Sequence, residues 1–336
     1  MARQPRRQAP SRPPVPRRFV IDLGRLKTYR LAQRKSKVNT KLFATPLPKG
    51  GSFRRFLSSL PAILAAADFR RVIDAVVTAH RRGRPVIVGM GSHPIKVGLN
   101  PLFIELMERG VVTGVALNGS GIIHDVELAL HGQTSEEVEA GIDNGSFGMA
   151  EETATIINRA ISEGARAGLG IGEAIGRRLT NRSAFPHNRY SLLAAAVRCN
   201  VPVTVHVAIG TDIIHMHPSC DGAAVGAASL RDFHRLTQLV AGLRQGVYLN
   251  IGSAVILPEV FLKAVTIARN LGFPAREFTT VNMDFIQQYR PVTNVVRRPT
   301  QQSGRGYALT GHHEIMVPLL VAGILDKLSA SPRKFS

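Results

Sequence analysis

Short runs of apolar residues alternate with longer segments in which apolar residues recur at helical spacing, from about residue 57 almost to the end of the chain. The short runs predict strands, because a strand covered on both faces is apolar throughout, and the longer segments predict amphipathic helices. Five strands are expected, at 84–94, 111–121, 201–212, 246–254 and 278–285. Helices are expected at 60–83, 95–110, from about 124, and at 149–179, 190–200, 227–243, 257–272 and 315–328.

This alternation indicates an α/β protein with an open, mostly parallel, doubly wound Rossmann-like sheet. Helices that separate successive strands return the chain, so that each strand can start in the same direction as the one before it. An eight-stranded barrel needs more strand–helix units than this pattern supplies. We therefore expect a single α/β domain at 57–330.

The N-terminal region differs from the rest in composition. Residues 1–18 are rich in Pro and Arg and predict a disordered tail, residues 19–56 form a basic arm, and residues 331–336 form a second short tail. Residues 1–42 hold thirteen basic residues against one acid, so they carry +12 of the total charge of +20 and leave +8 for the rest. We expect this region to be solvated, to lie over a neighbouring subunit, or to make a weak contact with RNA or another polyanion.

The remaining composition limits the compartment and the class of protein. The chain has two cysteines without a metal-type pairing motif, no long apolar run and no apolar core of a secretory signal. These features predict a cytoplasmic protein without a membrane span. The absence of Trp and an aromatic content of 6% do not favour base stacking on aromatic side chains.

Small or polar residues follow nearly every predicted strand. They are Gly91–Ser92–His93, Asn118–Gly119–Ser120–Gly121, Gly210–Thr211–Asp212, Gly252–Ser253 and Asn282–Met283–Asp284. In an open α/β sheet ligands bind beyond the carboxyl ends of the strands, where glycines allow close approach of the backbone. Each glycine loop alone can be a structural turn, but the repeated bias predicts a ligand site on this face.

Several histidines lie in or just after these segments, namely His124, His215, His217, His312 and His313. Because the pKa of histidine lies near neutrality, such residues suit proton transfer or substrate binding. There are two alternatives. One is a metal site built on His124, Asp212, His215 and His217, with the His312–Glu314 segment nearby. The other is a purely structural role for these histidines. His206 lies within a predicted strand and is interpreted as a core histidine.

The order of these segments resembles the deoxyhypusine synthase family over roughly residues 57–328. The resemblance is carried by "VGMGSHPIKVGLNPLFIELMERGVVTGVALNGSGIIHDVELAL", "SLLAAAVRCNVPVTVHVAIGTDIIHMH", "YLNIGSAVILPEVFLKAV", "FTTVNMDFIQ" and "IMVPLLVAGIL". It implies a Rossmann-like sheet, a homotetramer and NAD as cofactor. It places NAD against Gly91, Ser92, His93, Asn118, Gly119, Ser120, Gly121, Asp212 and Asp284.

The catalytic residues of that family do not all have counterparts here. The family's acidic residue after the second strand corresponds to His124, and its histidine early in a later helix corresponds most nearly to Glu259. The family's nucleophilic lysine is missing, since no lysine occurs between Asp284 and Glu314, where four arginines stand instead. Arginine stays protonated and does not form an imine.

We therefore expect an NAD-dependent enzyme that acts on a small amine, an amino acid or a related metabolite, and not a true deoxyhypusine synthase. The expected catalytic residues are His124, Glu259 and His313. The expected substrate contacts are Asp125, His215, Arg297 and Arg298, the arginines suiting an anionic group. A metal-dependent enzyme on the same scaffold and a noncatalytic RNA- or protein-binding relative are the alternatives.

Overall fold

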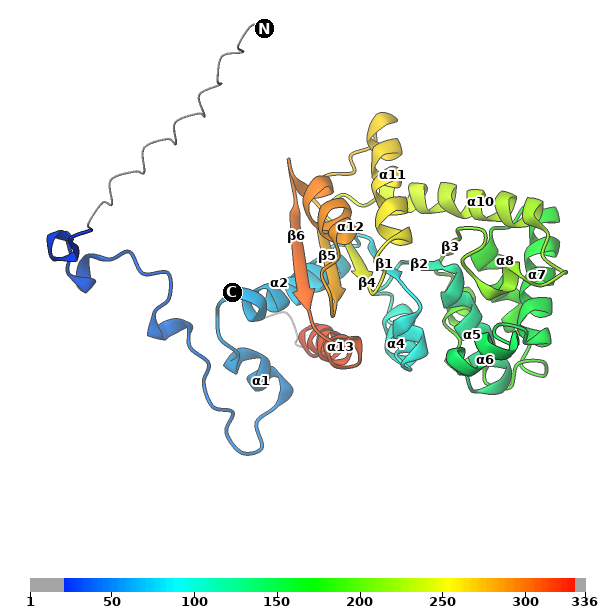
Figure 1. Ribbon diagram of the computed structural model, residues 1–336, viewed down its shortest axis with the longest axis horizontal. Helices are drawn as coiled ribbons and strands as arrows, with labels where there is room; N and C mark the ends of the chain where they lie inside the picture. Colours follow the sequence, from blue (N-terminus) through cyan, green and yellow to red (C-terminus); the bar gives the residue numbers. More distant parts are fainter. Residues whose placement is uncertain (1–20, 330–336) are drawn as a thin grey trace, which may run out of the picture. The chain divides into compact units, whose positions relative to one another are not determined.

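A computed structural model describes residues 21–329, so the tails expected at 1–18 and 331–336 lie outside the described residues (Figure 1). The chain divides into two units, Met1–Leu42 and Phe43–Ser336. In the first unit, the described residues form three short 3₁₀ turns at Leu23–Arg25, Leu31–Gln33 and Thr40–Leu42, none of which contains a buried residue. Apolar side chains of this arm, including Ile21 and Leu31, are largely exposed.

The second unit contains a six-stranded sheet in which every pairing is parallel. The strands are β1 (Val86–Met90), β2 (Gly114–Asn118), β3 (Val203–His206), β4 (Val247–Ile251), β5 (Thr279–Asp284) and β6 (Arg305–Thr310). Their order is β3-β2-β1-β4-β5-β6. This order is that of a doubly wound Rossmann-like fold, so the predicted fold class is confirmed.

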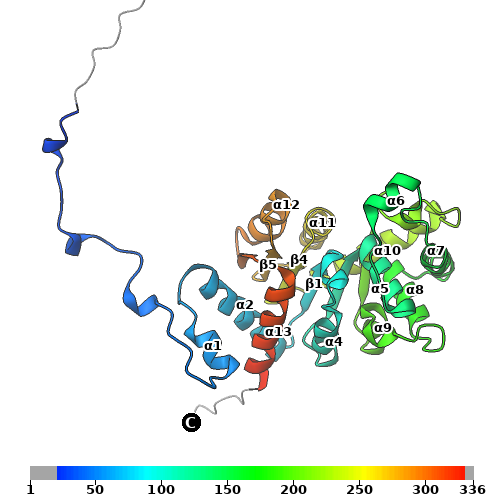
Figure 2. The same cartoon turned by 60° about the horizontal axis from the view of Figure 1, so that its bottom comes forward.

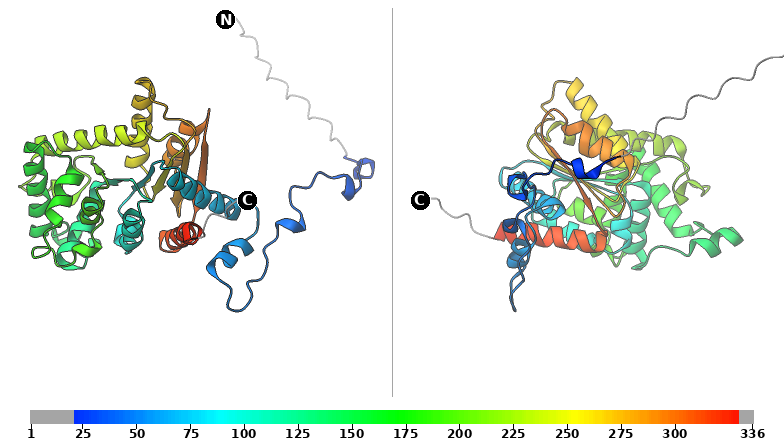
Figure 3. Two further views of the ribbon diagram at one scale, coloured as in Figure 1. Left: turned by 180° about the vertical axis from the view of Figure 1, so that it is seen from behind. Right: turned by 60° about the vertical axis from the view of Figure 1, so that its left-hand side comes forward.

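Thirteen α-helices accompany the strands within residues 21–329. They are α1 (Phe53–Ser59), α2 (Leu64–Arg81), α3 (His93–Lys96), α4 (Asn100–Glu108), α5 (Gly119–His131), α6 (Val138–Asn144), α7 (Glu151–Arg166), α8 (Ile171–Leu179), α9 (Leu192–Arg198), α10 (Gly222–Ala241), α11 (Ile256–Asn270), α12 (Tyr289–Pro291) and α13 (His313–Ser329). Helices α2, α4 and α13 lie on one side of the sheet and α11 on the other (Figures 2 and 3). None of the described helices is long and apolar enough to cross a membrane.

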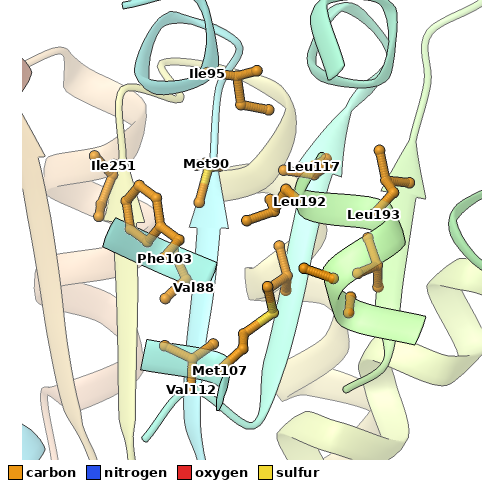
Figure 4. Close-up of a cluster of buried hydrophobic side chains, with 14 of the residues drawn as sticks. Val88, Met90, Ile95, Phe103, Met107, Val112, Leu117, Leu192, Leu193 and Ile251 are labelled. Carbon is orange, nitrogen blue, oxygen red and sulfur yellow. The ribbon is translucent and has the colours of Figure 1, made fainter. Parts of the chain in front are cut away.

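The two faces of the sheet have separate cores because side chains alternate along each strand. On one face, apolar side chains of the central strands meet α4 and α9, as Figure 4 shows. The labelled residues there are Val88 and Met90 of β1, Leu117 of β2, Ile251 of β4, Phe103 and Met107 of α4, Leu192 and Leu193 of α9, with Ile95 and Val112. Burial of both faces explains why buried and exposed residues do not alternate along β1 to β5.

On the opposite face an aromatic stack joins the sheet to α11. The rings of Tyr248 and Phe261 are parallel with centroids 3.8 Å apart. Gly89 of the neighbouring strand makes room for this stack, since a Cβ atom there would lie 2.3 Å from the Tyr248 hydroxyl. The face therefore accepts large rings only because a strand residue beside them has no side chain.

Of the elements that differ from the prediction, three have a clear local cause. Strand β6 was not predicted, because in this edge strand only Leu309 is buried and the segment has no apolar run. The helix predicted at 95–110 is two helices, since Gly98 adopts a φ of +80° between α3 and α4. Helix α5 begins at Gly119 and not near residue 124, because the Asn118 side chain accepts the Gly121 amide and caps the helix earlier.

A buried carboxylate, Asp232 of α10, ties two distant segments together. It is 1% exposed and accepts the backbone amides of Gly172 (3.0 Å) and Val205 (2.9 Å). Burial raises the pKa of Asp232 to about 7, although these amide hydrogen bonds favour the ionised form. The folded state therefore binds the Asp232 proton more tightly than the unfolded chain does.

The Asp232 carboxyl should make folding stability depend on pH. A folded-state pKa above the unfolded value gives a contribution that is complete near pH 4 and lost as the pH rises through 7. Relative to Asp232→Asn, the wild-type free energy of unfolding should fall by about 2–3 kcal/mol between pH 5 and pH 8. Urea unfolding at the two pH values measures this difference, and replacement of the exposed Asp143 by Asn serves as the control. A difference that does not vary with pH would contradict the assignment.

Candidate functional site

The carboxyl ends of the six strands form one continuous edge. The register pairs Asn118 with His206 and Asp284 with Thr310, while Gly91 and Gly252 directly follow β1 and β4. The chain proceeds from β1 outward to β2 and β3, and from β4 outward to β5 and β6. The switch point therefore lies between β1 and β4, where open α/β sheets bind their ligands.

At the switch point the two loops pack backbone to backbone. The Gly91 amide donates to the Ile251 carbonyl (3.0 Å), and a Cβ atom on Gly91 would lie 2.2 Å from the Gly252 carbonyl oxygen. Gly252 has a φ of +66°, and a Cβ atom there would lie 2.7 Å from Cε1 of His313. Both glycines are thus required by the close approach of these loops and of the His313 ring.

His93, His313 and Asp284 form a chain of polar groups beside this junction. The Nδ1 atoms of His93 and His313 are 2.9 Å apart. His313 is fully buried, and its Nε2 lies 3.2 Å from the Met283 carbonyl oxygen and 3.7 Å from a carboxylate oxygen of Asp284. The structure thus brings together two residues expected at the cofactor and one expected in catalysis.

The partners of His313 determine where the protons lie. A carbonyl oxygen only accepts, so His313 carries its proton on Nε2 and donates it to Met283. In the neutral ring Nδ1 of His313 is then an acceptor, and the Nδ1–H group of His93 must donate to it. Burial lowers the pKa of His313, although Asp284 opposes the effect. The Nε2 lone pair of His93 is left to accept a proton from elsewhere.

The glycine loop Asn118–Gly121, expected to contact NAD, is occupied by the protein's own groups. A Cβ atom on Gly119 would lie 2.0 Å from a carboxylate oxygen of Asp212, and the Ser120 amide hydrogen-bonds to the same carboxylate. Asn118 accepts the Gly121 amide (3.1 Å). Burial raises the pKa of Asp212. A phosphate at the α5 N-terminus would therefore meet a carboxylate already bound there.

His124 belongs to a second chain of hydrogen bonds, on α5. The Thr134 hydroxyl donates to Glu127 (2.5 Å), so it accepts from Nδ1–H of His124 (2.6 Å). This arrangement leaves the Nε2 lone pair of His124 free to accept a proton. The half-buried environment lowers the pKa of His124, and Lys96 also lowers it while Glu127 opposes them. His124 is therefore a neutral base near pH 7.

Asp125 does not face a ligand, contrary to the expectation of a substrate contact. It is fully buried, and its carboxylate accepts hydrogen bonds from Asn100, Ser191 and the amides of Leu192 and Leu193 at 2.6–3.1 Å. These contacts cap α9 and fix it to α5. Burial raises the pKa of Asp125 to about 6, whereas the hydrogen bonds lower it.

Glu259 is surrounded by cations. It is paired with Lys263, lies 3.5 Å from Arg290 and accepts from the Asn294 side chain (2.7 Å). The hydrogen bond from Lys263 is the largest influence that lowers the pKa of Glu259. The expected role in proton transfer is thus disfavoured, because a carboxylate held in its ionised form is a weak base.

Arg297 and Arg298 do not reach the carboxyl edge, where a substrate contact was expected. Both are exposed, and Arg298 donates to Asn294 (2.8 Å). The next residue, Pro299, accepts from Arg269 in the last turn of α11. Because α11 begins at the carboxyl edge of the sheet and leads away from it, these arginines lie away from the switch point.

The histidines proposed for the metal alternative use their Nδ1 atoms within the protein. Nδ1 of His215 accepts the amides of Gly210 and Asp212, and Nδ1 of His217 accepts the Ser219 amide (3.1 Å). Within residues 21–329, no three His, Cys, Asp or Glu side chains form a group that could hold a metal ion.

Lys96 is a further residue near this edge that the sequence pattern does not single out. It ends α3, directly after the Gly91–His93 loop, and it is exposed. Its ammonium group has no hydrogen bond or ion pair with any residue of 21–329, and it lies close enough to His124 to affect the pKa of that ring. Its position just beyond β1 was the only sign in the sequence that it lies near this edge. A single lysine in a short helix forms no recognisable pattern.

No family model and no curated protein matches the sequence. Among solved structures, the ternary complex of AgrE with ornithine and NAD+ is similar over 78% of this chain and 33% of that chain, with a TM-score of 0.52 and 16% identity. A conserved LOR/SDH-type protein from Methanococcus maripaludis S2 is similar over 79% of this chain and 71% of that chain, with a TM-score of 0.50 and 14% identity. The chain shares their Rossmann-like fold.

The chain spans about a third of the length of AgrE. A candidate deoxyhypusine synthase from Entamoeba histolytica is matched over 84% of this chain and 96% of that chain, with a TM-score of 0.49 and 11% identity. The Rossmann-like fold that the sequence resemblance implied is confirmed by the AgrE and LOR/SDH-type structures. Identities this low leave activity to be argued from the residues themselves.

The hydrogen-bond chain at the switch point predicts a defined pair of tautomers. At pH 8, nitrogen-15 NMR of the histidine side chains should show the proton of His93 on Nδ1 and that of His313 on Nε2. The variant His93→Ala assigns the signals, and replacement of the exposed His234 serves as the control because it should leave both unchanged. A proton on Nδ1 of neutral His313 would contradict the chain.

Proposed function

We propose that the protein is an NAD-dependent enzyme that oxidises a small amine, an amino acid or a related metabolite, and that it is not a deoxyhypusine synthase. The observation that carries this proposal is the position of the His93–His313–Asp284 chain at the switch point between β1 and β4. The shared fold supports it, since the AgrE structure contains ornithine and NAD+.

Some residues at this edge are placed to contact a dinucleotide, whereas others already bind one another. Gly91, Ser92 and His93 follow β1 at the switch point, and Asp284 ends β5, so these residues would hold the central and reactive parts of NAD. Asn118–Gly121 and Asp212 are bonded to one another and would form the wall on the β2 side. Bound NAD would supply the hydride acceptor.

Residues of this chain would move the proton that accompanies oxidation. His93 would accept a proton at Nε2 from the substrate amine or hydroxyl, and its Nδ1–H would continue to donate to His313. The Nε2–H of His313 points to Met283 beside the Asp284 carboxylate, whose negative charge would stabilise a positive charge on the histidine pair. His124 would act as a second base, oriented by Thr134 and Glu127.

The lysines support chemistry other than that of deoxyhypusine synthase. Lys263 is paired with Glu259 and Lys327 with Asp74, so the ammonium group of each is engaged by a carboxylate. Lys96 is the lysine that a covalent step at this edge would use, because it follows the β1 loop and lies near His124.

Exposed apolar side chains around the edge support assembly into a homo-oligomer, for which the family resemblance suggests a tetramer. Phe285, Ile286 and Tyr289 follow β5 with exposures of 47%, 53% and 73%, and Ile315 in α13 is 58% exposed. A cluster of this kind beside a site is typical of a surface covered by another subunit. We expect a cytoplasmic location for the protein. The basic arm would make at most a weak contact with a polyanion.

Binding of NAD and the role of His124 can be tested together. Calorimetry should show that the wild type binds NAD, and His124→Ala should retain this binding while turnover on a panel of amines and amino acids falls about 100-fold or more. The control His234→Ala should change neither property.

Two results would count against the proposal. Protein that purifies without NAD and binds none by calorimetry would exclude an NAD enzyme. Loss of NAD binding in His124→Ala would show that this residue contacts the cofactor instead of moving a proton. Native mass spectrometry of the same samples reports the number of subunits and any nucleotide that remains bound.

A further inference from the structure

A cavity of about 410 Å³ lies at the carboxyl end of β3, between α10 and α11. Its walls are mainly apolar, formed by Ile209, Leu230, Phe233, Val255, Ile256 and Val260. Ile209, Leu230 and Val255 are 63%, 54% and 47% exposed, which is unusual for large apolar side chains that converge on one hollow. Apolar walls with few polar groups are typical of a small-molecule site.

His206 supplies a buried polar group to this cavity. The residue is 3% exposed and its Nε2 lies 3.0 Å from the Thr204 hydroxyl, which in turn donates to the Val115 carbonyl. We assign the single hydroxyl proton of Thr204 to the Val115 carbonyl (3.4 Å), so that Thr204 accepts from Nε2–H of His206 (3.0 Å). In this tautomer Nδ1 of His206 is a hydrogen-bond acceptor.

This Nδ1 atom has no hydrogen-bond partner among residues 21–329. The protein does not enclose it completely. Burial lowers the pKa of His206 to about 3, so the ring stays neutral at physiological pH. An acceptor that the protein leaves without a partner is available to a donor that enters the cavity. The cavity thus has mainly apolar walls, with Ser229 and Glu259 also in its lining, and Nδ1 of His206 is an acceptor that suits an N–H group.

We propose that this cavity binds the adenine ring of a dinucleotide, with the exocyclic amine donating to Nδ1 of His206. The ring would lie between the apolar side chains of Ile209 and Val255. A purine with a carbonyl group in place of the amine would direct a second lone pair at Nδ1 and bind less well. The inference rests on the proposed NAD-dependent function and names where its nucleobase lies.

The place of the cavity in the sheet favours a dinucleotide over a smaller ligand. His206 ends β3, and Asp284 ends β5, with β2, β1 and β4 between them. Four strand spacings of about 4.8 Å separate the two ends by roughly 19 Å. An extended ligand with its base at His206 crosses the switch point and brings its far end to the His93–His313 pair.

The experiment compares NAD with nicotinamide hypoxanthine dinucleotide, in which a carbonyl replaces the adenine amine. Calorimetry on the full chain should give about 10-fold weaker binding or more for the hypoxanthine compound. In His206→Leu this preference should disappear. Ile209→Asp should weaken NAD at least 10-fold, whereas Leu271→Asp, at an exposed apolar residue after α11, should change it less than 2-fold.

The outcomes separate the two proposals. Equal binding of the two dinucleotides, with no effect of Ile209→Asp, would overturn the adenine site and leave an NAD enzyme intact. If NAD does not bind at all, AMP is the probe. AMP binding that is lost in Ile209→Asp would support the nucleotide cavity without the NAD function, and no AMP binding would overturn the cavity as well. Circular dichroism confirms that each variant is folded.

Discussion

The parallel direction of all six strands is the constraint on which the site depends. It brings every strand's carboxyl end to one edge, so residues more than two hundred positions apart in sequence, such as His93 and His313, become neighbours. The reversal of winding between β1 and β4 opens this edge at its centre. The close packing of Gly91 on Gly252 keeps the two central loops together and leaves His313 wedged over them.

Buried carboxylates complete the framework by binding backbone amides. Asp125 binds the amides that begin α9, Asp212 binds the first turn of α5, and Asp232 joins α8 to β3. Each carboxylate is taken out of water, so burial raises all three pKa values. The amide hydrogen bonds offset part of that cost, because they favour the charged form. These acids therefore hold helices in place around the edge, and they are not free to bind ligand.

The histidines near the edge differ in role because their neighbours differ. His313 is enclosed and passes its hydrogen bonds to His93, whereas His124 is oriented by a threonine and a glutamate. His206 is neutral and lines a mainly apolar cavity. The Nδ1 atoms of His215 and His217 accept hydrogen bonds from nearby backbone amides. The hydrogen-bonding partners of each histidine, and not its proximity to a strand end, distinguish the candidate bases from the histidines with a structural role.

The sequence by itself determined the five apolar strands, the doubly wound class and the polar residues at the strand ends, because burial on both faces leaves a continuous apolar pattern. It did not reveal β6, since an edge strand buries a single apolar residue. It placed Asp125 and Asp212 correctly after their strands, but only the tertiary structure showed that helix amides bind both. The pairing of His93 with His313 and the cavity at His206 were likewise decided by the packing of segments far apart in the chain, and local spacing carries no record of such contacts.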